Sequence, residues 1–154
     1  MTTALAHPSA GSRPTRMPST PSMTAWIIDA MNVIGSRPTG WWRNRPAAVI
    51  RLLDATRRLV AVSREPVTLV VDGRPPPHVS DVGEEGGVCV VYAARAGANA
   101  ADDRIVDLVA SAPDPATVRV VTSDRALQAR VRALGARVVS AHEWLLRLDA
   151  TGSP

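Results

Sequence analysis

Short, nearly uninterrupted apolar runs alternate along this chain with segments whose apolar residues have helical spacing. Strands that carry apolar side chains on both faces are typical of parallel sheets covered by helices on both sides. The alternation therefore predicts an α/β fold with a mostly parallel central sheet. The strand-like runs lie at residues 25–28, 67–71, 88–92, 118–121 and 138–139.

Helix signals stand between these runs. Pro46 occupies the position of a helix-starting proline, and apolar residues with helical spacing follow it. Residues 73–87 hold three consecutive prolines and a run of Gly and Glu, and they predict a long flexible loop. Helices are also expected over residues 99–110 and 124–134, and a last one is opened by a capping box of Ser140 and Glu143.

The first 22 residues differ from the rest in composition. They hold four Pro, four Ser, four Thr, two Arg and no acidic residue, and they lack the apolar core of a secretory signal. We expect a disordered tail over residues 1–22 and one domain over residues 23–150. No run approaches the ~20 apolar residues of a membrane span, so a cytoplasmic protein that contacts no membrane is expected.

The basic residues of the chain are all arginine. The 18 Arg face 14 acidic residues, a net charge of +4, but without the two Arg of the tail the balance is 16 to 14. Charge alone is therefore a weak argument for a nucleic-acid partner. The absence of lysine excludes P-loop nucleotide binding, Schiff-base catalysis and a phosphorelay receiver domain. The single cysteine, Cys89, excludes an internal disulfide and a Cys-rich zinc site.

Aspartates follow three of the predicted strands. Asp29 ends the first run, Asp102 and Asp103 come a few residues after the third, and Asp124 follows the fourth. Because the carboxyl ends of parallel strands share one edge, these side chains should converge. Close carboxylates repel one another unless a cation lies between them, and oxygen-only ligands favour Mg²⁺ or Mn²⁺. Such an ion can activate water at a phosphodiester.

Each of these residues also has a purely structural interpretation. Asp29 can close a turn, Asp102 can complement the dipole of its helix behind an Asn99 cap, and Asp124 can cap the next helix. Asp72, at the end of the second run, is expected to support the site or only a turn with Gly73.

Three motifs, in this order and at these strand ends, carry a family resemblance: Asp29-Ala-Met-Asn32, Ala101-Asp-Asp-Arg-Ile-Val106 and Val121-Thr-Ser-Asp124-Arg-Ala-Leu-Gln128. Together they resemble the NYN branch of the PIN-like nuclease superfamily, and within it the YacP-like bacterial RNA-binding proteins, over residues 24–148. The resemblance implies a PIN-like, Rossmann-like three-layer α/β/α sandwich, a divalent metal and cleavage of single-stranded RNA.

Site residues follow from the motif positions. The resemblance implies that Asn32 holds a water or a phosphate oxygen near the metal. Many relatives carry Gly-Tyr where this chain has Ala30-Met31, so a substrate-stacking tyrosine is missing at that position. The implied metal-binding carboxylates are those of Asp29, Asp102, Asp103 and Asp124.

A candidate RNA surface precedes the helix that begins at Pro46. Residues 41–45 place two tryptophans beside arginines, as single-strand binding surfaces do. We expect one Trp to pack on the core and the other, Trp42, to contact RNA. Ordinary solvated arginine is the alternative for each candidate phosphate ligand, and these are Arg37, Arg43, Arg45 and Arg125.

The sequence thus predicts a metal-dependent ribonuclease that hydrolyses single-stranded RNA with a metal-activated water. The alternative is a non-catalytic RNA-binding module of the same fold that acts in RNA metabolism or on ribosomes, although the intact acidic set disfavours it. A haloacid-dehalogenase-type phosphatase would need an aspartate where Met31 stands. Besides RNA, a ribosome and a second copy of the chain stay open as partners.

Overall fold

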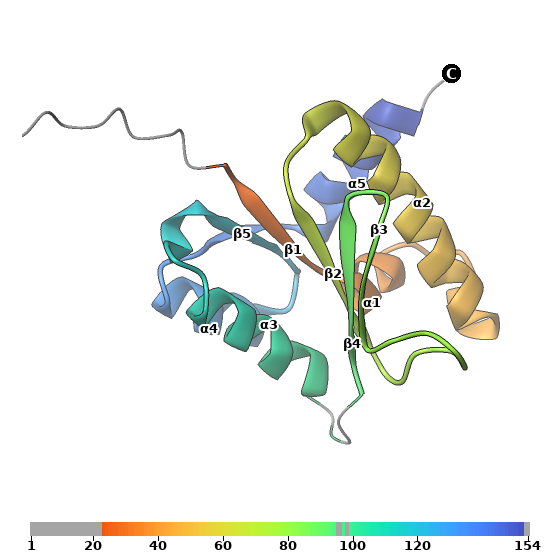
Figure 1. Cartoon of the computed structure of the whole chain (residues 1–154), viewed down its shortest axis with the longest axis horizontal. Coiled ribbons are helices and arrows are strands. Elements are labelled where there is room, and N and C mark those ends of the chain that lie inside the picture. The colour runs from red at the N-terminus through yellow and green to blue at the C-terminus, as the bar shows by residue number, and fades with distance from the viewer. Residues whose placement is uncertain (1–22, 95–96, 98, 153–154) are drawn as a thin grey trace, which may run out of the picture.

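A six-stranded sheet forms the centre of the protein (Figure 1). The computed structural model describes residues 23–94, 97 and 99–152, so the tail over residues 1–22 lies outside the described residues. The strand order in the sheet is β3-β4-β2-β1-β5-β6, and among these strands only β3 is antiparallel to its neighbour. The strands are β1 (Ala25–Asp29), β2 (Val67–Asp72), β3 (Val82–Glu85), β4 (Val88–Ala93), β5 (Val118–Val121) and β6 (Arg137–Val139).

Helices cover both faces of the sheet, as Figure 1 shows. One face carries α1 (Ala30–Gly35), α2 (Arg45–Ser63) and α5 (Ala141–Gly152), and the other carries α3 (Ala100–Ala110) and α4 (Arg125–Ala133). The predicted three-layer α/β/α sandwich is therefore confirmed. No helix in the described part of the chain is both long enough and apolar enough to cross a membrane.

The inner strands carry apolar residues at consecutive positions because their side chains pack into two separate cores, one on each face of the sheet. In β1, Trp26 and Ile28 belong to the core under α2 and α5, whereas Ile27 between them belongs to the core under α3 and α4. In β2, Leu69 and Val70 divide in the same way, and both are fully buried. Side chains of a strand alternate between faces, so two covered faces require apolar residues at every position.

Helices α2 and α5 begin at the predicted signals. The Asn44 side chain accepts a hydrogen bond of 3.1 Å from the Ala47 amide, with Pro46 in the first turn of α2. The Ser140 hydroxyl accepts one of 3.1 Å from the Glu143 amide at the start of α5, which is one half of the predicted capping box. These caps satisfy amides that a helix leaves without partners.

The expectation of a loop over residues 73–87 is wrong in part. Residues 82–85 form β3, an edge strand that pairs with β4 through a two-residue turn at Gly86 and Gly87. Both glycines have positive φ, 58° and 80°, which is the backbone that a tight hairpin turn requires. All four residues of β3 are exposed, so its sequence has no alternating apolar pattern from which a strand could be predicted. The short helix α1 and a 3-10 turn at Trp41–Arg43 were also not predicted.

Candidate active site

Two neighbouring strands place Asp29 beside the segment that holds Asp124. In the parallel pair of β1 and β5, Ile28 lies opposite Val121, so Asp29 and Thr122 come next at the same edge. Asp29 is the last residue of β1 and only 7% exposed. A buried carboxylate, that of Asp29, therefore lies at the carboxyl end of the central strands, where the aspartates were expected to converge.

Burial raises the pKa of Asp29 to about 6 from an ordinary value of 3.8. The hydroxyl of Thr122 and the backbone amide of Asn32 oppose this rise, because both favour the charged carboxylate. The negative charges of Asp102 and Asp124 add to it. The three carboxylates therefore lie within electrostatic reach of one another, although they come from three separate parts of the chain.

Thr122 links two of these carboxylates. Its Oγ1 donates a hydrogen bond of 3.0 Å to Oδ2 of Asp29 and accepts one of 3.1 Å from the backbone amide of Asp124. The side chain of Gln128 donates a bond of 2.9 Å to the Thr122 carbonyl. Thr122 is fully buried, and sequence reasoning missed it as a site residue. The available signal was a polar residue directly after the apolar run of β5.

Asp124 caps a helix, as one of its two predicted interpretations states, while its predicted metal-binding role stays a prediction. Its Oδ1 accepts a hydrogen bond of 3.1 Å from the Leu127 amide and so caps α4. At the same time its charge raises the pKa of Asp29 and of Asp102. The cap fixes the orientation of the carboxylate, because one of its oxygens is held against the first turn of the helix.

Asp102 and Asp103 stand in the first turn of α3, where a negative charge complements the helix dipole. The pKa of Asp102 is raised by burial and by Asp124, with smaller contributions from Asp103 and Asp72, whereas Arg130 lowers it. Asp103 instead receives a hydrogen bond of 2.9 Å from Arg130 of α4. The structure thus groups Asp102 with Asp29 and Asp124, and pairs Asp103 with an arginine that the sequence analysis did not single out.

Asn32 connects the end of β1 with the loop after β5. Its side-chain Oδ1 accepts a hydrogen bond of 2.8 Å from the backbone amide of Ser123. The hydroxyl of Ser123 in turn accepts one of 3.2 Å from the Ala141 amide, at the start of α5. Asn32 therefore holds the Thr122–Asp124 segment in register with Asp29; its predicted contact with a water or phosphate stays a prediction.

A divalent cation fits the donor chemistry and the charge of this edge. All the candidate ligands are carboxylate oxygens. Burial raises the pKa of Asp29 and Asp102 most, repulsion between the carboxylates adds to it, and a cation would relieve that repulsion. Among residues 23–94, 97 and 99–152, no three His, Cys, Asp or Glu side chains are already gathered closely enough to hold an ion directly. Mg²⁺ keeps several waters and is commonly held by one or two carboxylates, so a complete set of direct ligands is not required.

The two aromatic candidates differ in exposure. Trp41 is partly buried, and its ring approaches the position where Gly35 would carry a Cβ. Trp42 is 59% exposed and lies edge-on to Trp41, with 6.2 Å between the ring centres. The guanidinium of Arg45 stands 5.9 Å from the centre of the Trp41 ring. Together these residues form an exposed surface of aromatic and cationic groups before α2.

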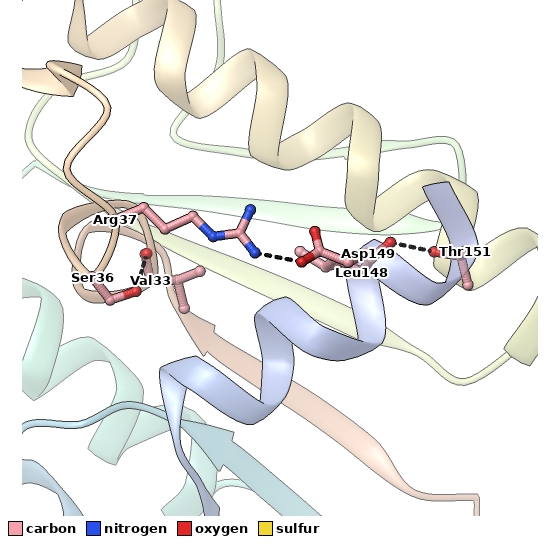
Figure 2. Close-up of polar contacts among 6 residues, drawn as sticks. All are labelled: Val33, Ser36, Arg37, Leu148, Asp149 and Thr151. Atoms are coloured by element: carbon pink, nitrogen blue, oxygen red, sulfur yellow. Dashed lines mark hydrogen bonds and ion pairs between the residues drawn. The ribbon is translucent and has the colours of Figure 1, made fainter. Parts of the chain in front are cut away.

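Arg37 is engaged away from the acidic edge. Figure 2 shows its guanidinium pointing to Asp149 of α5, with a distance of 2.6 Å between Nη2 and Oδ2. The pair borders a hollow of about 540 Å³ between α1, α2 and α5. Arg43 and Arg125 are exposed, and Arg125 directly follows Asp124 at the start of α4. Because Arg37 is paired with Asp149, an RNA phosphate would have to compete with Asp149 for the Arg37 guanidinium.

The mostly parallel sheet, with helices on both faces and aspartates at the carboxyl ends of its strands, defines a Rossmann-like α/β domain. The chain belongs to the YacP-like NYN domain family, whose family model matches residues 26–153. The predicted family is thus confirmed.

The fold is similar to that of Rae1 (YacP) from Bacillus subtilis. The crystal structure of that protein has a TM-score of 0.70 and 24% sequence identity, and the match covers 84% of this chain and 75% of that chain. A tryptophan-to-leucine mutant of the same protein gives a TM-score of 0.66 at 24% identity, over 84% of this chain and 77% of that chain. No curated protein matches this chain.

Proposed function

We propose that this protein is a metal-dependent ribonuclease that hydrolyses phosphodiester bonds of single-stranded RNA at the carboxyl edge of its sheet. The observation that carries the proposal is geometric: the buried carboxylate of Asp29 is joined through Thr122 to the Asp124 segment, and Asp102 lies near enough for its charge to act on Asp29. A fold gains no stability from carboxylates that raise one another's pKa, so their placement at this edge favours a cation-binding role.

Asp29, Asp102 and Asp124 would hold one or two Mg²⁺ or Mn²⁺ ions, and Asp103 would add charge from the adjoining position. When bound, such an ion supplies an activated water and neutralises charge on the phosphate. Thr122 keeps Asp29 and Asp124 in a fixed relation through its two hydrogen bonds. Asn32 holds the Ser123 amide in place.

The exposed cationic and aromatic groups would hold the RNA strand. Arginine side chains pair with phosphates, and a base stacks on an aromatic ring for roughly 1–3 kcal/mol. Trp42 offers such a ring on the surface before α2. The candidate phosphate ligands are Arg43 and Arg45 beside the tryptophans and Arg125 after Asp124, with Arg37 available only when its ion pair with Asp149 opens.

The decisive experiment measures cleavage of single-stranded and structured RNAs with Mg²⁺, with Mn²⁺ and with a chelator. We expect metal-dependent cleavage by the wild type and a loss of about 100-fold or more in Asp29→Asn and Asp102→Asn, as removal of a metal-holding carboxylate should produce. Asp107→Asn is the matched control, because it removes the same charge from an exposed position of α3.

The contrary result separates the two candidate functions. Metal-independent RNA binding without any cleavage, unchanged by Asp29→Asn, would replace the nuclease with a non-catalytic RNA-binding module. Including purified ribosomes in the RNA panel tests whether the substrate is presented by a ribosome.

A further inference from the structure

A pocket of about 350 Å³ opens between β2, β4 and the start of α2. This volume lies within the ~300–1,000 Å³ range of small-molecule pockets. Its lining combines apolar and charged side chains, among them Met31, Val71, Tyr92, Asp72, Arg45 and Arg74.

The pocket adjoins the acidic edge. Asp72 ends β2 and lines the pocket, and its charge also raises the pKa of Asp102. Met31, another lining residue, is two positions from Asp29 in the first turn of α1. The pocket and the acidic edge therefore meet at the carboxyl ends of β1 and β2.

The lining suits a flat apolar ring that carries N–H donors and is attached to an anion. Met31, Val71 and Tyr92 provide apolar surface, and Tyr92 is half-buried against the core under α2. The carboxylate oxygens of Asp72 are hydrogen-bond acceptors, so this residue favours a ligand with N–H groups.

The charges at the pocket point to the same kind of ligand. Arg45 and Arg74 outnumber Asp72, which leaves the pocket positive and suits a phosphate-bearing ligand. Arg45 also lies against Trp41, so the pocket continues into the aromatic surface that includes Trp42.

We propose that this pocket receives one nucleobase of the RNA strand, next to the phosphate held at the acidic edge. In this subsite the Tyr92 ring packs against the base, Asp72 accepts a hydrogen bond from a base N–H, and Arg45 and Arg74 hold the flanking phosphates. The assignment rests on the proposed ribonuclease function and adds a position at which the enzyme senses a base.

An abasic scan tests the subsite. One nucleotide at a time in a labelled single-stranded RNA is replaced by an abasic ribose, and the Kd is measured by fluorescence anisotropy in a chelator. The wild type should lose about 10-fold in affinity at one position of the scan, in line with the stacking of one base. Tyr92→Leu should bind the intact RNA about 10-fold more weakly and should no longer respond to the abasic site at that position.

Two control variants keep the result interpretable. Tyr92→Phe retains the ring and should behave like the wild type, which separates loss of the ring from misfolding. Leu146→Ala removes an exposed apolar side chain from α5, outside the pocket, and should leave the abasic scan unchanged.

The subsite is overturned if Tyr92→Leu keeps the wild-type affinity and abasic response, or if the wild type responds at no position. Cleavage with Mn²⁺ is measured in parallel on the same RNAs. Cleavage without any abasic response would leave the nuclease and remove the subsite, whereas an abasic response without cleavage would support the subsite and remove hydrolysis. Absence of RNA binding as well as cleavage would overturn both.

Discussion

The hydroxyl of Thr122 donates a 3.0 Å hydrogen bond to Asp29, although the two residues lie 93 positions apart in the chain. The same hydroxyl oxygen accepts the amide of Asp124. Because its own hydrogen is directed to Asp29, Thr122 stabilises the ionised form of that carboxylate. One buried side chain thus controls both the position of Asp124 and the charge of Asp29.

Replacing Thr122 by valine removes this donor while keeping the shape of the side chain. The pKa of Asp29 should rise further, by about one unit, since a hydrogen bond to a charged group contributes about 1.5–3 kcal/mol and one pKa unit corresponds to about 1.4 kcal/mol. The acid limb of the pH profile for RNA cleavage should move up by about the same amount. Thr122→Ser keeps the donor and should retain the wild-type limb; equal profiles for all three proteins would contradict the role of Thr122.

Asp29→Asn should stabilise the metal-free protein. The pKa of Asp29 is about 6 in the folded chain and near 3.8 when unfolded, so between these values the folded state binds more protons. Stability therefore falls as pH rises through this window, by roughly 2–3 kcal/mol above pH 6. Urea unfolding in a chelator should show Asp29→Asn more stable than the wild type at pH 8 and similar at pH 4. A variant that is less stable at pH 8 would show that burial does not penalise the Asp29 charge.

The sequence was informative wherever a residue type carries its own local signal. Asp29 and Asp124 stand at the ends of apolar runs, and parallel strands bring such ends together. Thr122 was missed because a threonine after a strand acquires its role only through a partner 93 residues away. Arg130 was missed because its partner Asp103 lies on another helix, and β3 was missed because its side chains have no buried face.

Arg130→Gln should affect catalysis more than stability. The Arg130–Asp103 pair has both side chains nearly half exposed, and pairs of this kind contribute at most about 1 kcal/mol to folding. Arg130 also lowers the pKa of Asp102, so its loss should shift the acid limb of cleavage to higher pH. Arg132→Gln, an exposed arginine of the same helix, is the control. A stability loss of several kcal/mol without a change in the pH profile would assign Arg130 a structural role only.

Mn²⁺ should raise the thermal stability of the wild type at neutral pH. An ion at 100 times its Kd stabilises the folded state by about 2.7 kcal/mol, provided that it does not bind the unfolded chain. The effect should weaken toward pH 5, because protons then compete for Asp29, whose pKa is about 6. Differential scanning fluorimetry should show no Mn²⁺ response in Asp102→Asn and a normal one in Asp107→Asn. A pH-independent response shared by both variants would place the ion elsewhere.

Alanine variants of the two neighbouring tryptophans should differ in effect, one weakening RNA binding and the other lowering the stability of the fold. Trp42 is mostly exposed and contributes little packing, so Trp42→Ala should leave the unfolding midpoint almost unchanged. Its loss should weaken single-stranded RNA binding by roughly 1–3 kcal/mol, the contribution of one stacked base. Trp41→Ala removes a partly buried ring that packs beside Gly35 and Arg45, so it should lower the unfolding midpoint. Anisotropy titrations and urea unfolding of both variants check this division. If Trp42→Ala binds RNA like the wild type, the RNA strand does not pass over the surface before α2.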